Sequence, residues 1–243
     1  MIQLNVNDKH LLLVGAHCGD VELQAGAIAH KYAKAGWKVT FLHLTAGEKG
    51  NPPAISVDDY AEQKVMEAQK AAKILGGNSI TLDYKDAELM FNKEIVFQLA
   101  KIMRELNPDV VITHWENSIH PDHTTCAKIV KEAQLLSALA GFKFDKLAPH
   151  FYPFYHSENW EDMEGYEPDI YIDVTGEFET YLEAISQYWF VVNSPSFRYY
   201  DYYKALGTVR GCLSGFKYAQ TLKHPIGRNV YHGDGIPGYE MYD

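Results

Sequence analysis

The chain has 243 residues, of which 47% are hydrophobic, and its formal net charge at pH 7 is -10. A chain of this length and apolar content can bury one large core, so we expect a single globular domain over residues 1–243. The acidic balance excludes a surface of clustered lysines and arginines, and with it nucleic acid as a partner.

The N-terminal residues show no basic start followed by an apolar core, and the apolar run 11–16 is far shorter than a membrane-spanning helix. The three cysteines, Cys18, Cys126 and Cys212, are too few and too scattered for a disulfide framework. We therefore expect a cytoplasmic protein that does not contact a membrane.

The first 140 residues alternate short apolar runs with segments of helical periodicity. Ser56 is a typical N-cap, and Gly76-Gly77 ends the helix that it begins. The expected strands are 11–15, 38–44, 79–82 and 109–114, and the expected helices are 22–35, 56–75, 94–106 and 124–140. This alternation predicts an α/β fold: a Rossmann-like three-layer α/β/α arrangement with a mostly parallel sheet.

The remainder of the chain is expected to extend the same domain, because no linker rich in Gly, Pro or Ser separates it. Two aromatic runs, 188–190 and 199–203, indicate a subunit interface and so a homo-oligomer. The tail 224–243 has little periodicity, and we expect it to be irregular and to cover either the ligand crevice or a neighbouring subunit. The further strands expected are 151–155 and 169–173, and the further helices are 177–190 and 197–215.

Two polar motifs follow two of the expected strands. His17 and Asp20 lie where the first strand gives way to a helix, and His120-Pro121-Asp122-His123 lies in the loop after the fourth strand. In an open parallel sheet, loops at the carboxyl ends of the strands meet in one crevice. Two imidazoles and one carboxylate, from His17, Asp20 and His123, are a typical ligand set for catalytic zinc, and Fe²⁺ or Mn²⁺ would also accept it.

A structural interpretation of the same residues exists. In that interpretation His17 packs under a turn, Asp20 caps the following helix, and Pro121-Asp122 only begins another helix. The joint occurrence of both motifs at two strand ends favours the metal site.

At these residues the chain resembles the PIG-L/LmbE-like deacetylases, which remove acetyl groups from N-acetylglucosamine-type substrates. Ala16-His17-Cys18-Gly19-Asp20-Val21-Glu22 is similar to the first motif of that family, Ala-His-Pro-Asp-Asp with a spaced Glu, and the second motif is intact at 120–123. The stretches 42–48, 86–89, 107–111 and 167–173 also fit the family, so the resemblance covers most of the chain.

The resemblance implies an LmbE-like fold, a zinc site made by His17, Asp20 and His123, and a supporting role for Glu22. It also implies that His120 assists the developing oxyanion or the leaving amine, and that Asp122 orients a nearby histidine. The implied substrate is a small N-acetylated sugar conjugate.

Four positions depart from the family pattern. Gly19 stands where the family has the aspartate that acts as general base, and Cys18 replaces the proline before it. Ala46 stands where an arginine that contacts substrate is common, and Gln220 occupies a position that is often Glu. Because a positioned base contributes about 10²–10⁴-fold to rate, Gly19→Asp is predicted to raise deacetylation, provided that the turn does not require a positive φ.

Two functions remain open from the sequence. One is an active zinc-dependent deacetylase that hydrolyses an N-acetyl group of a small amide substrate. The alternative is a catalytically silent relative that keeps the metal site and binds a sugar-like ligand or a partner protein.

Overall fold

The structure is a computed structural model, and it describes residues 9–160, 164–226 and 230–240. Its centre is one sheet with the strand order β3-β2-β1-β4-β5-β7-β6-β8. The first five strands of this order are parallel to one another, whereas β7 runs antiparallel to both of its neighbours. The strands are β1 His10–His17, β2 Lys38–Thr45, β3 Asn78–Tyr84, β4 Val110–His114, β5 Phe154–Ser157, β6 Ile170–Asp173, β7 Ala219–Lys223 and β8 Tyr231–Gly233.

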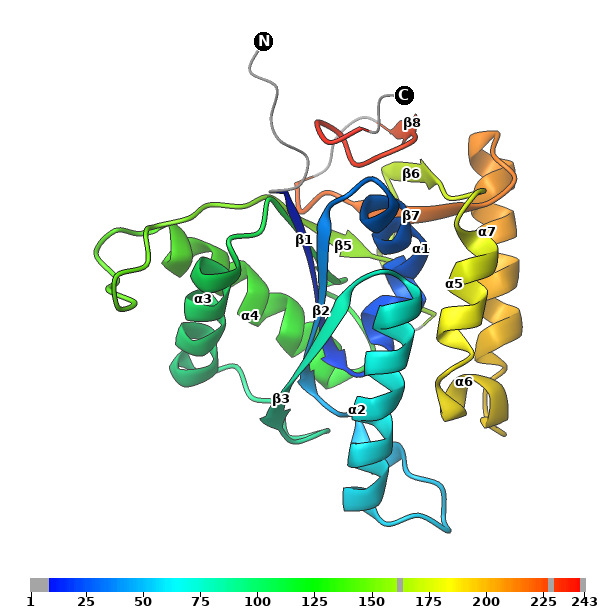
Figure 1. The fold of residues 1–243 in the computed structure, drawn as a ribbon, viewed down its shortest axis with the longest axis horizontal. Helices are drawn as coiled ribbons and strands as arrows, with labels where there is room; N and C mark the ends of the chain where they lie inside the picture. The colour runs from blue at the N-terminus through cyan, green and yellow to red at the C-terminus, as the bar shows by residue number, and fades with distance from the viewer. Residues whose placement is uncertain (1–8, 161–163, 227–229, 241–243) are drawn as a thin grey trace.

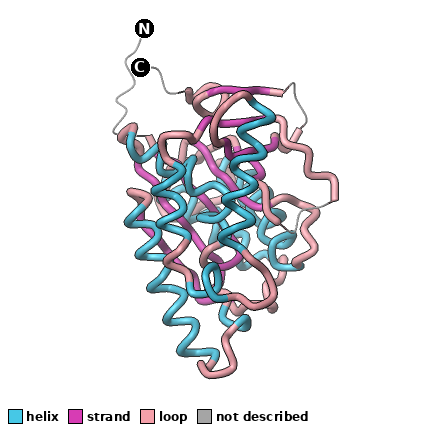
Figure 2. The backbone as a smooth tube through the Cα atoms, turned by 90° about the vertical axis from the view of Figure 1, so that its right-hand side faces the viewer, coloured by secondary structure: helices cyan, strands magenta, loops and turns pink. Residues whose placement is uncertain are grey.

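Helices cover both faces of the sheet, as Figure 1 shows, and in Figure 2 the helices of one face lie in front of the strands. On one face lie α3 (Lys93–Leu106) and α4 (Pro121–Ala138), which pack against the apolar cluster around Leu12 and Val111. The other face carries α1 (Asp20–Lys34), α2 (Val57–Ile74), α5 (Phe178–Ile185), α6 (Trp189–Asn193) and α7 (Tyr199–Ser214). The predicted three-layer α/β/α class with a mostly parallel sheet is confirmed.

Strands β1 and β4 are neighbours, although β1 is followed in sequence by β2 and β3 on its other side. The chain thus changes direction across the sheet between β1 and β4, and the carboxyl ends of two such strands border a crevice where α/β proteins bind ligands. His17 is the last residue of β1, and His120 precedes α4, the helix after β4. The fold alone therefore brings the two polar motifs to one place.

Several boundaries differ from the sequence prediction. Helix α4 begins at Pro121, three residues earlier than expected, so Asp122 and His123 lie in its first turn and His120 is its N-cap. The reason is that proline at the first helical position costs no hydrogen bond. The expected strand 151–155 is observed at Phe154–Ser157, and the expected helix 177–190 is divided into α5 and α6.

Most described residues of the tail 224–243 are irregular, as predicted, but the structure corrects the prediction in part. Residues 231–233 form β8, which pairs with β6, so this part of the tail is regular. The Tyr239 hydroxyl donates to Asp109 O, and the Tyr32 hydroxyl donates to Tyr239 O. Asp109 precedes β4 and Tyr32 lies near the end of α1, so the described tail residues lie at the amino end of the strands, away from the crevice. Residues 227–229 and 241–243 lie outside the described part.

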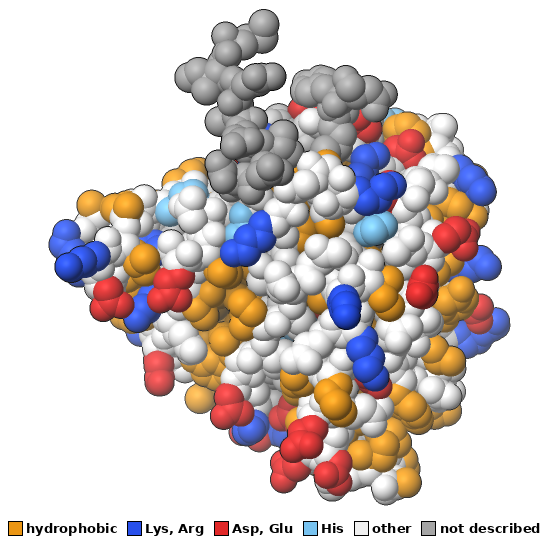
Figure 3. Space-filling model, viewed as in Figure 1, with side chains coloured by type: hydrophobic (Ala, Val, Ile, Leu, Met, Phe, Trp, Pro, Cys, Tyr) orange, Lys and Arg blue, Asp and Glu red, His pale blue; other side chains and the backbone are white. Residues whose placement is uncertain are grey.

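The aromatic runs point inward to a large extent. Tyr188 is fully buried and Tyr203 is 3% exposed, and both belong to the core between the sheet and the outer helices. Figure 3 shows acidic and basic side chains interspersed over the face seen in Figure 1, with acidic ones gathered at its lower end. Among the helices of the described residues, none combines the length and apolarity that a membrane span requires.

Candidate metal centre

The first polar motif is held by a tight turn between β1 and α1. Gly19, the N-cap of α1, has φ of +106° and ψ of -26°, a conformation that side-chain-bearing residues rarely adopt. The turn lets Asp20 Oδ2 accept a hydrogen bond from the backbone N–H of His17 at 2.8 Å. Residues 17 and 20 are thereby fixed side by side at the carboxyl end of β1.

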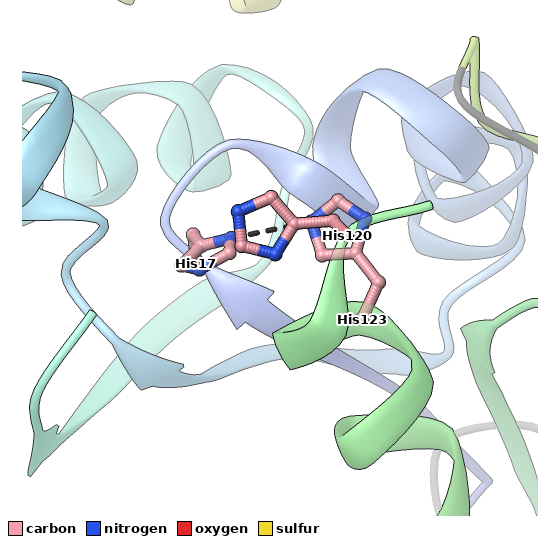
Figure 4. A group of neighbouring side chains, drawn as sticks. All are labelled: His17, His120 and His123. Carbon is pink, nitrogen blue, oxygen red and sulfur yellow. Dashed lines mark hydrogen bonds between the residues drawn. The ribbon is translucent and has the colours of Figure 1, made fainter. Parts of the chain in front are cut away.

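The second motif approaches from the start of α4. The three imidazoles of His17, His120 and His123 converge, the first from the end of β1 and the other two from α4 and its N-cap (Figure 4). His120 lies edge-on to His17, with a centroid separation of 4.8 Å, and stacks on His123 at 4.6 Å.

Three donor atoms lie close enough to share one cation. His17 Nδ1 is 3.1 Å from Asp20 Oδ2 and 3.2 Å from His123 Nε2, and His123 Nε2 is 3.3 Å from Asp20 Oδ2. A tetrahedral zinc site with metal–ligand distances of about 2.0–2.1 Å has donor atoms about 3.3–3.4 Å apart. The spacing therefore fits a metal ion bound by His17, Asp20 and His123, the set predicted from the sequence.

The outward nitrogens of the two histidines meet partners of their own. His17 Nε2 lies 3.1 Å from Asp86 Oδ1 and 3.3 Å from Asp122 Oδ2. A carboxylate at the second nitrogen fixes the tautomer that presents Nδ1 to a metal. His123 Nδ1 faces Asn159 Nδ2 at 3.2 Å. Asp122 thus lies where the resemblance places it, beside a histidine.

Charge complementarity holds the group together. Burial disfavours the charged imidazole of His17, but Asp20 and Asp122 raise the pKa of His17 well above its ordinary value. Burial also acts against the charged form of Asp20, yet His123 and His17 lower the pKa of Asp20 well below its ordinary value. The pKa of Asp86 falls to about 2, because the hydrogen bond and charge of His17 outweigh its burial.

His114, at the end of β4, completes the floor of the site. Its Nε2 accepts a hydrogen bond from the Ala16 N–H at 2.9 Å and lies 3.2 Å from Asp20 Oδ2. Its ring stacks on His123 at a centroid separation of 4.1 Å, and burial lowers the pKa of His114 to about 3. Since the Ala16 N–H occupies its Nε2 lone pair, this neutral imidazole supports the ligands instead of joining them.

Glu22, which the resemblance implies as a supporting residue, lies beneath the turn. It is fully buried, and both of its carboxylate oxygens accept from His43 Nε2, at 3.0 and 3.1 Å. Gln220, the residue at the position that is often Glu, accepts through Oε1 from the N–H groups of Ala27 and Ile28. These two N–H groups follow the non-helical residue Ala25 within α1, so Gln220 stabilises a kinked helix.

The side of the site at Gly19 is closed by an aromatic ring. A Cβ atom at Gly19 would lie 3.0 Å from Cε1 and Cζ of Phe190 and 3.4 Å from Cε1 of Tyr188. The place of the family's base is therefore occupied by apolar atoms, and a larger residue would need both backbone strain and displacement of Phe190.

A cavity of about 550 Å³ opens above the donor atoms. Trp160 lines it and stacks on Phe197 at 4.3 Å, so one face of that indole is already covered. Residues 161–163, which follow Trp160, lie outside the described residues. Among the residues lining the cavity are the predicted His17, Asp20, His120 and His123 and, in addition, Lys49, Lys64, Asp86, Asn159 and Phe190.

The sequence interpretation did not assign a role to His114, Lys64 or Asn159. His114 ends a predicted parallel strand, so the rule that ligands bind at the carboxyl ends of strands was a usable signal for it. Lys64 lies in the middle of an amphipathic helix and Asn159 follows a short strand. Neither spacing nor composition separates such residues from ordinary surface residues.

The fold and the site define a Rossmann-like α/β protein with a histidine–aspartate centre at the carboxyl edge of its parallel strands. The chain belongs to the PIG-L family: residues 12–134 match the family model described as GlcNAc-PI de-N-acetylase.

Relatives of this chain differ in activity. It is 25% identical over 243 residues to 4-oxalmesaconate hydratase of Pseudomonas putida, covering 96% of this chain and 90% of that protein. It is 24% identical over 228 residues to diacetylchitobiose deacetylase of Thermococcus kodakarensis, covering 88% and 82%. The solved structure of 4-carboxy-2-hydroxymuconate hydratase from Pseudomonas putida superposes with a TM-score of 0.82 at 22% identity, covering 92% of this chain and 98% of that one.

Proposed function

We propose that the chain is a metal-dependent hydrolase that removes the N-acetyl group from a small amide substrate of the N-acetylglucosamine type or a related one. The observation that carries this proposal is the spacing of His17 Nδ1, Asp20 Oδ2 and His123 Nε2, at 3.1–3.3 Å from one another at the floor of a cavity. Zinc or another divalent ion held there would polarise the acetyl carbonyl and lower the pKa of water.

The protein groups then have distinct tasks. His120 lines the cavity beside the ligand pair and is placed to transfer a proton to the leaving amine and to stabilise the oxyanion. Its Nδ1 accepts from the Asp122 N–H at 3.2 Å, which leaves Nε2 as the atom for proton transfer. Asp122 orients His17, and Phe190 excludes water from the side of Gly19.

The proposal is tested by loading the purified protein with Zn²⁺ or Fe²⁺ and measuring acetate release from N-acetylglucosamine and its conjugates. Metal-dependent acetate release that disappears in His123→Ala supports it. No acetate from any N-acetylated sugar or amide, from protein that binds metal stoichiometrically, contradicts it.

A second candidate function is the addition of water to a carbon–carbon double bond of a small unsaturated acid. Two observations favour it: Gly19 and Phe190 remove the base position that deacetylation uses in the family, and the similarity to 4-oxalmesaconate hydratase covers 96% of this chain. Loss of the near-ultraviolet absorbance of a conjugated polycarboxylate, without acetate release, would favour hydration. The comparisons lend no support to a catalytically silent protein.

We also propose a cytoplasmic location, because Cys18, Cys126 and Cys212 are all free thiols and the first two are fully buried. Thiol titration of protein isolated under alkylating conditions tests this, with three free thiols per chain expected.

A further inference from the structure

A buried lysine lies in the wall of the cavity. Lys64, in the middle of α2, is 5% exposed, and its Nζ lies 4.1 Å from the ring centroid of Phe190 and 5.6 Å from that of Tyr188. The same side chain reaches toward the metal centre, since its Cε is 3.5 Å from the position of a Cβ at Gly47, which itself is 2.8 Å from His17 Cβ. The cation is thus adjacent to the site where chemistry takes place.

Among the described residues, Lys64 forms no ion pair with a carboxylate. Glu67 lies one turn further along α2, but its Oε1 accepts from Gln63 Nε2 at 2.7 Å and its Oε2 has no hydrogen-bond partner. Glu22 is bound to His43, and Asp20 faces His17 and His123. None of these three carboxylates, Glu67, Glu22 or Asp20, therefore forms an ion pair with the ammonium group of Lys64.

An unpaired buried charge is costly, and a ligand can relieve the cost. Burial lowers the pKa of Lys64, and the electrostatic influence of Cys18, Asp20, Glu67 and Glu22 only partly offsets that effect. Removing a charge from water without an oppositely charged partner is unfavourable. An anion bound at Lys64 Nζ would offset this cost. The position should therefore favour negatively charged ligands over neutral ones.

Part of the remaining wall is aromatic. Five aromatic side chains line the cavity, whereas Lys49, the other lysine that lines it, is 40% exposed at its side chain and paired with Glu88. Among the described lining residues, a single cation without a carboxylate partner, close enough to feel the charge of Asp20, suits a group of single negative charge better than a phosphate dianion. The aromatic residues are Tyr60, Trp160, Trp189, Phe190 and Tyr199.

We infer that Lys64 binds a carboxylate group of the substrate, and that the substrate is a small carboxylic acid whose apolar part packs against Phe190 and its aromatic neighbours. This inference rests on the proposed function in one respect, namely that the cavity above the metal ligands is the substrate site. Lys64 would thus supply, from α2, the positive charge that is missing at Ala46, the position where an arginine that contacts substrate is common in the family.

Binding of matched probes tests the inference without requiring turnover. Isothermal titration of metal-loaded protein would compare N-acetylphenylalanine with its carboxamide, which differ in the charged group alone, and inorganic phosphate. The variants are Lys64→Met, Lys64→Arg and, as a matched control, Lys49→Met. We expect the acid to bind at least 10-fold more tightly than the amide to the wild type, and phosphate to bind more weakly than the acid.

In Lys64→Met the preference for the acid should disappear while the affinity for the amide is unchanged, and Lys64→Arg should retain most of the preference. Lys49→Met should behave as the wild type. Because methionine has a similar volume and removes an unpaired buried charge, the melting temperature of Lys64→Met should be equal or higher, which separates lost recognition from unfolding.

Equal affinity for acid and amide, an unaltered preference in Lys64→Met, tighter binding of phosphate, or no saturable binding of the acid at millimolar concentration would each overturn the inference. If the proposed function fails but the inference holds, the acid still binds through Lys64, while no N-acetylated compound releases acetate. Conversely, acetate release from N-acetylated compounds together with equal affinity of the wild type for the acid and the amide would retain the deacetylase and reject the role of Lys64.

Discussion

The ring of Phe190 occupies the space that a side chain at Gly19 would need, with Cε1 and Cζ both 3.0 Å from the position of a Cβ. Together with the φ of +106° at Gly19, this contact changes what the sequence predicted for Gly19→Asp. The condition attached to that prediction, a turn free of positive φ, is not met. The turn requires glycine for two reasons, namely the positive φ of its backbone and the close approach of the Phe190 ring.

We now expect Gly19→Asp to lower stability and to give no gain in activity. A residue with a side chain in such a conformation costs about 1–3 kcal/mol, and displacement of Phe190 adds to that cost. Thermal unfolding and acetate release measure the two effects, with Phe190→Ala as the control for lost packing alone. A stable Gly19→Asp variant with enhanced turnover would show that the turn rearranges readily and that the base was the missing part.

Metal retention should depend on His17, Asp20 and His123 together. Each contributes one of three donor atoms, so His17→Ala, Asp20→Ala or His123→Ala should reduce bound metal to a small fraction of the wild-type content. Elemental analysis after dialysis against a weak chelator measures this. His30→Ala is the matched control, because His30 lies toward the end of α1 and its Nδ1 is 3.1 Å from the Leu75 carbonyl oxygen. Retention of full metal by any of the three variants would remove that residue from the ligand set.

Asp122 should affect metal affinity indirectly. Its Oδ2 lies 3.3 Å from His17 Nε2 and also accepts from the Ala87 N–H at 2.8 Å. Loss of a carboxylate that orients a ligating histidine typically costs about 10–100-fold in metal affinity or activity. Competition titration of Asp122→Asn with a chromogenic chelator measures the change, and an unaltered affinity would assign the orienting role to Asp86 alone.

His120→Ala should keep the metal and lose turnover. His120 lies against the imidazoles of His17 and His123 and lines the cavity, and its Nδ1 accepts from the Asp122 N–H, so we expect Nε2 to be the nitrogen that acts on substrate. Removal of a proton-transfer group typically lowers kcat by about 10²–10⁴-fold. Metal content and kcat should therefore respond separately. If His120→Ala lost its metal, His120 would have to be counted as a ligand.

Acid stability should depend on His10, which lies far from the metal centre at the start of β1. The imidazole is buried between the Leu106 carbonyl and the Thr40 hydroxyl, and burial lowers its pKa from the ordinary value of 6.5. The folded state therefore binds fewer protons than the unfolded state. The stability contributed by His10 is complete above pH 6.5 and is lost as the pH falls through the lowered pKa.

His10→Gln should thus flatten the pH dependence of the unfolding free energy below pH 6.5, by at most about 1.4 kcal/mol per pH unit for one proton. Denaturant titrations between pH 5 and pH 8 measure the slope. His43→Gln should change the pH dependence of the unfolding free energy in the opposite sense. Although burial disfavours charged His43, Glu22 raises its pKa, so its contribution is complete below pH 6.5 and is lost as the pH rises. Parallel slopes for wild type and His10→Gln would contradict the assignment.

The sequence by itself determined the class of fold and the place where the candidate ligands meet. Alternation of unbroken apolar runs with helical periodicity requires parallel strands buried by helices, because only that arrangement covers both faces of each strand. Strand ends that carry His17, Asp20 and His123 must then face one crevice, because parallel strands place their carboxyl ends at one edge. Both inferences use local patterns, and both needed no knowledge of side-chain contacts.

Only the tertiary structure decided what surrounds those ligands. Phe190 meets Gly19 across 171 positions of the chain, and Lys64 meets Phe190 across 126, by the differences of their numbers. No periodicity relates such residues, because their contact is set by how α2 and α6 pack over the turn after β1. The aromatic ring in the place of the base, the lysine without a carboxylate partner and the neutral His114 are therefore properties of packing, and packing is decided by the whole chain at once.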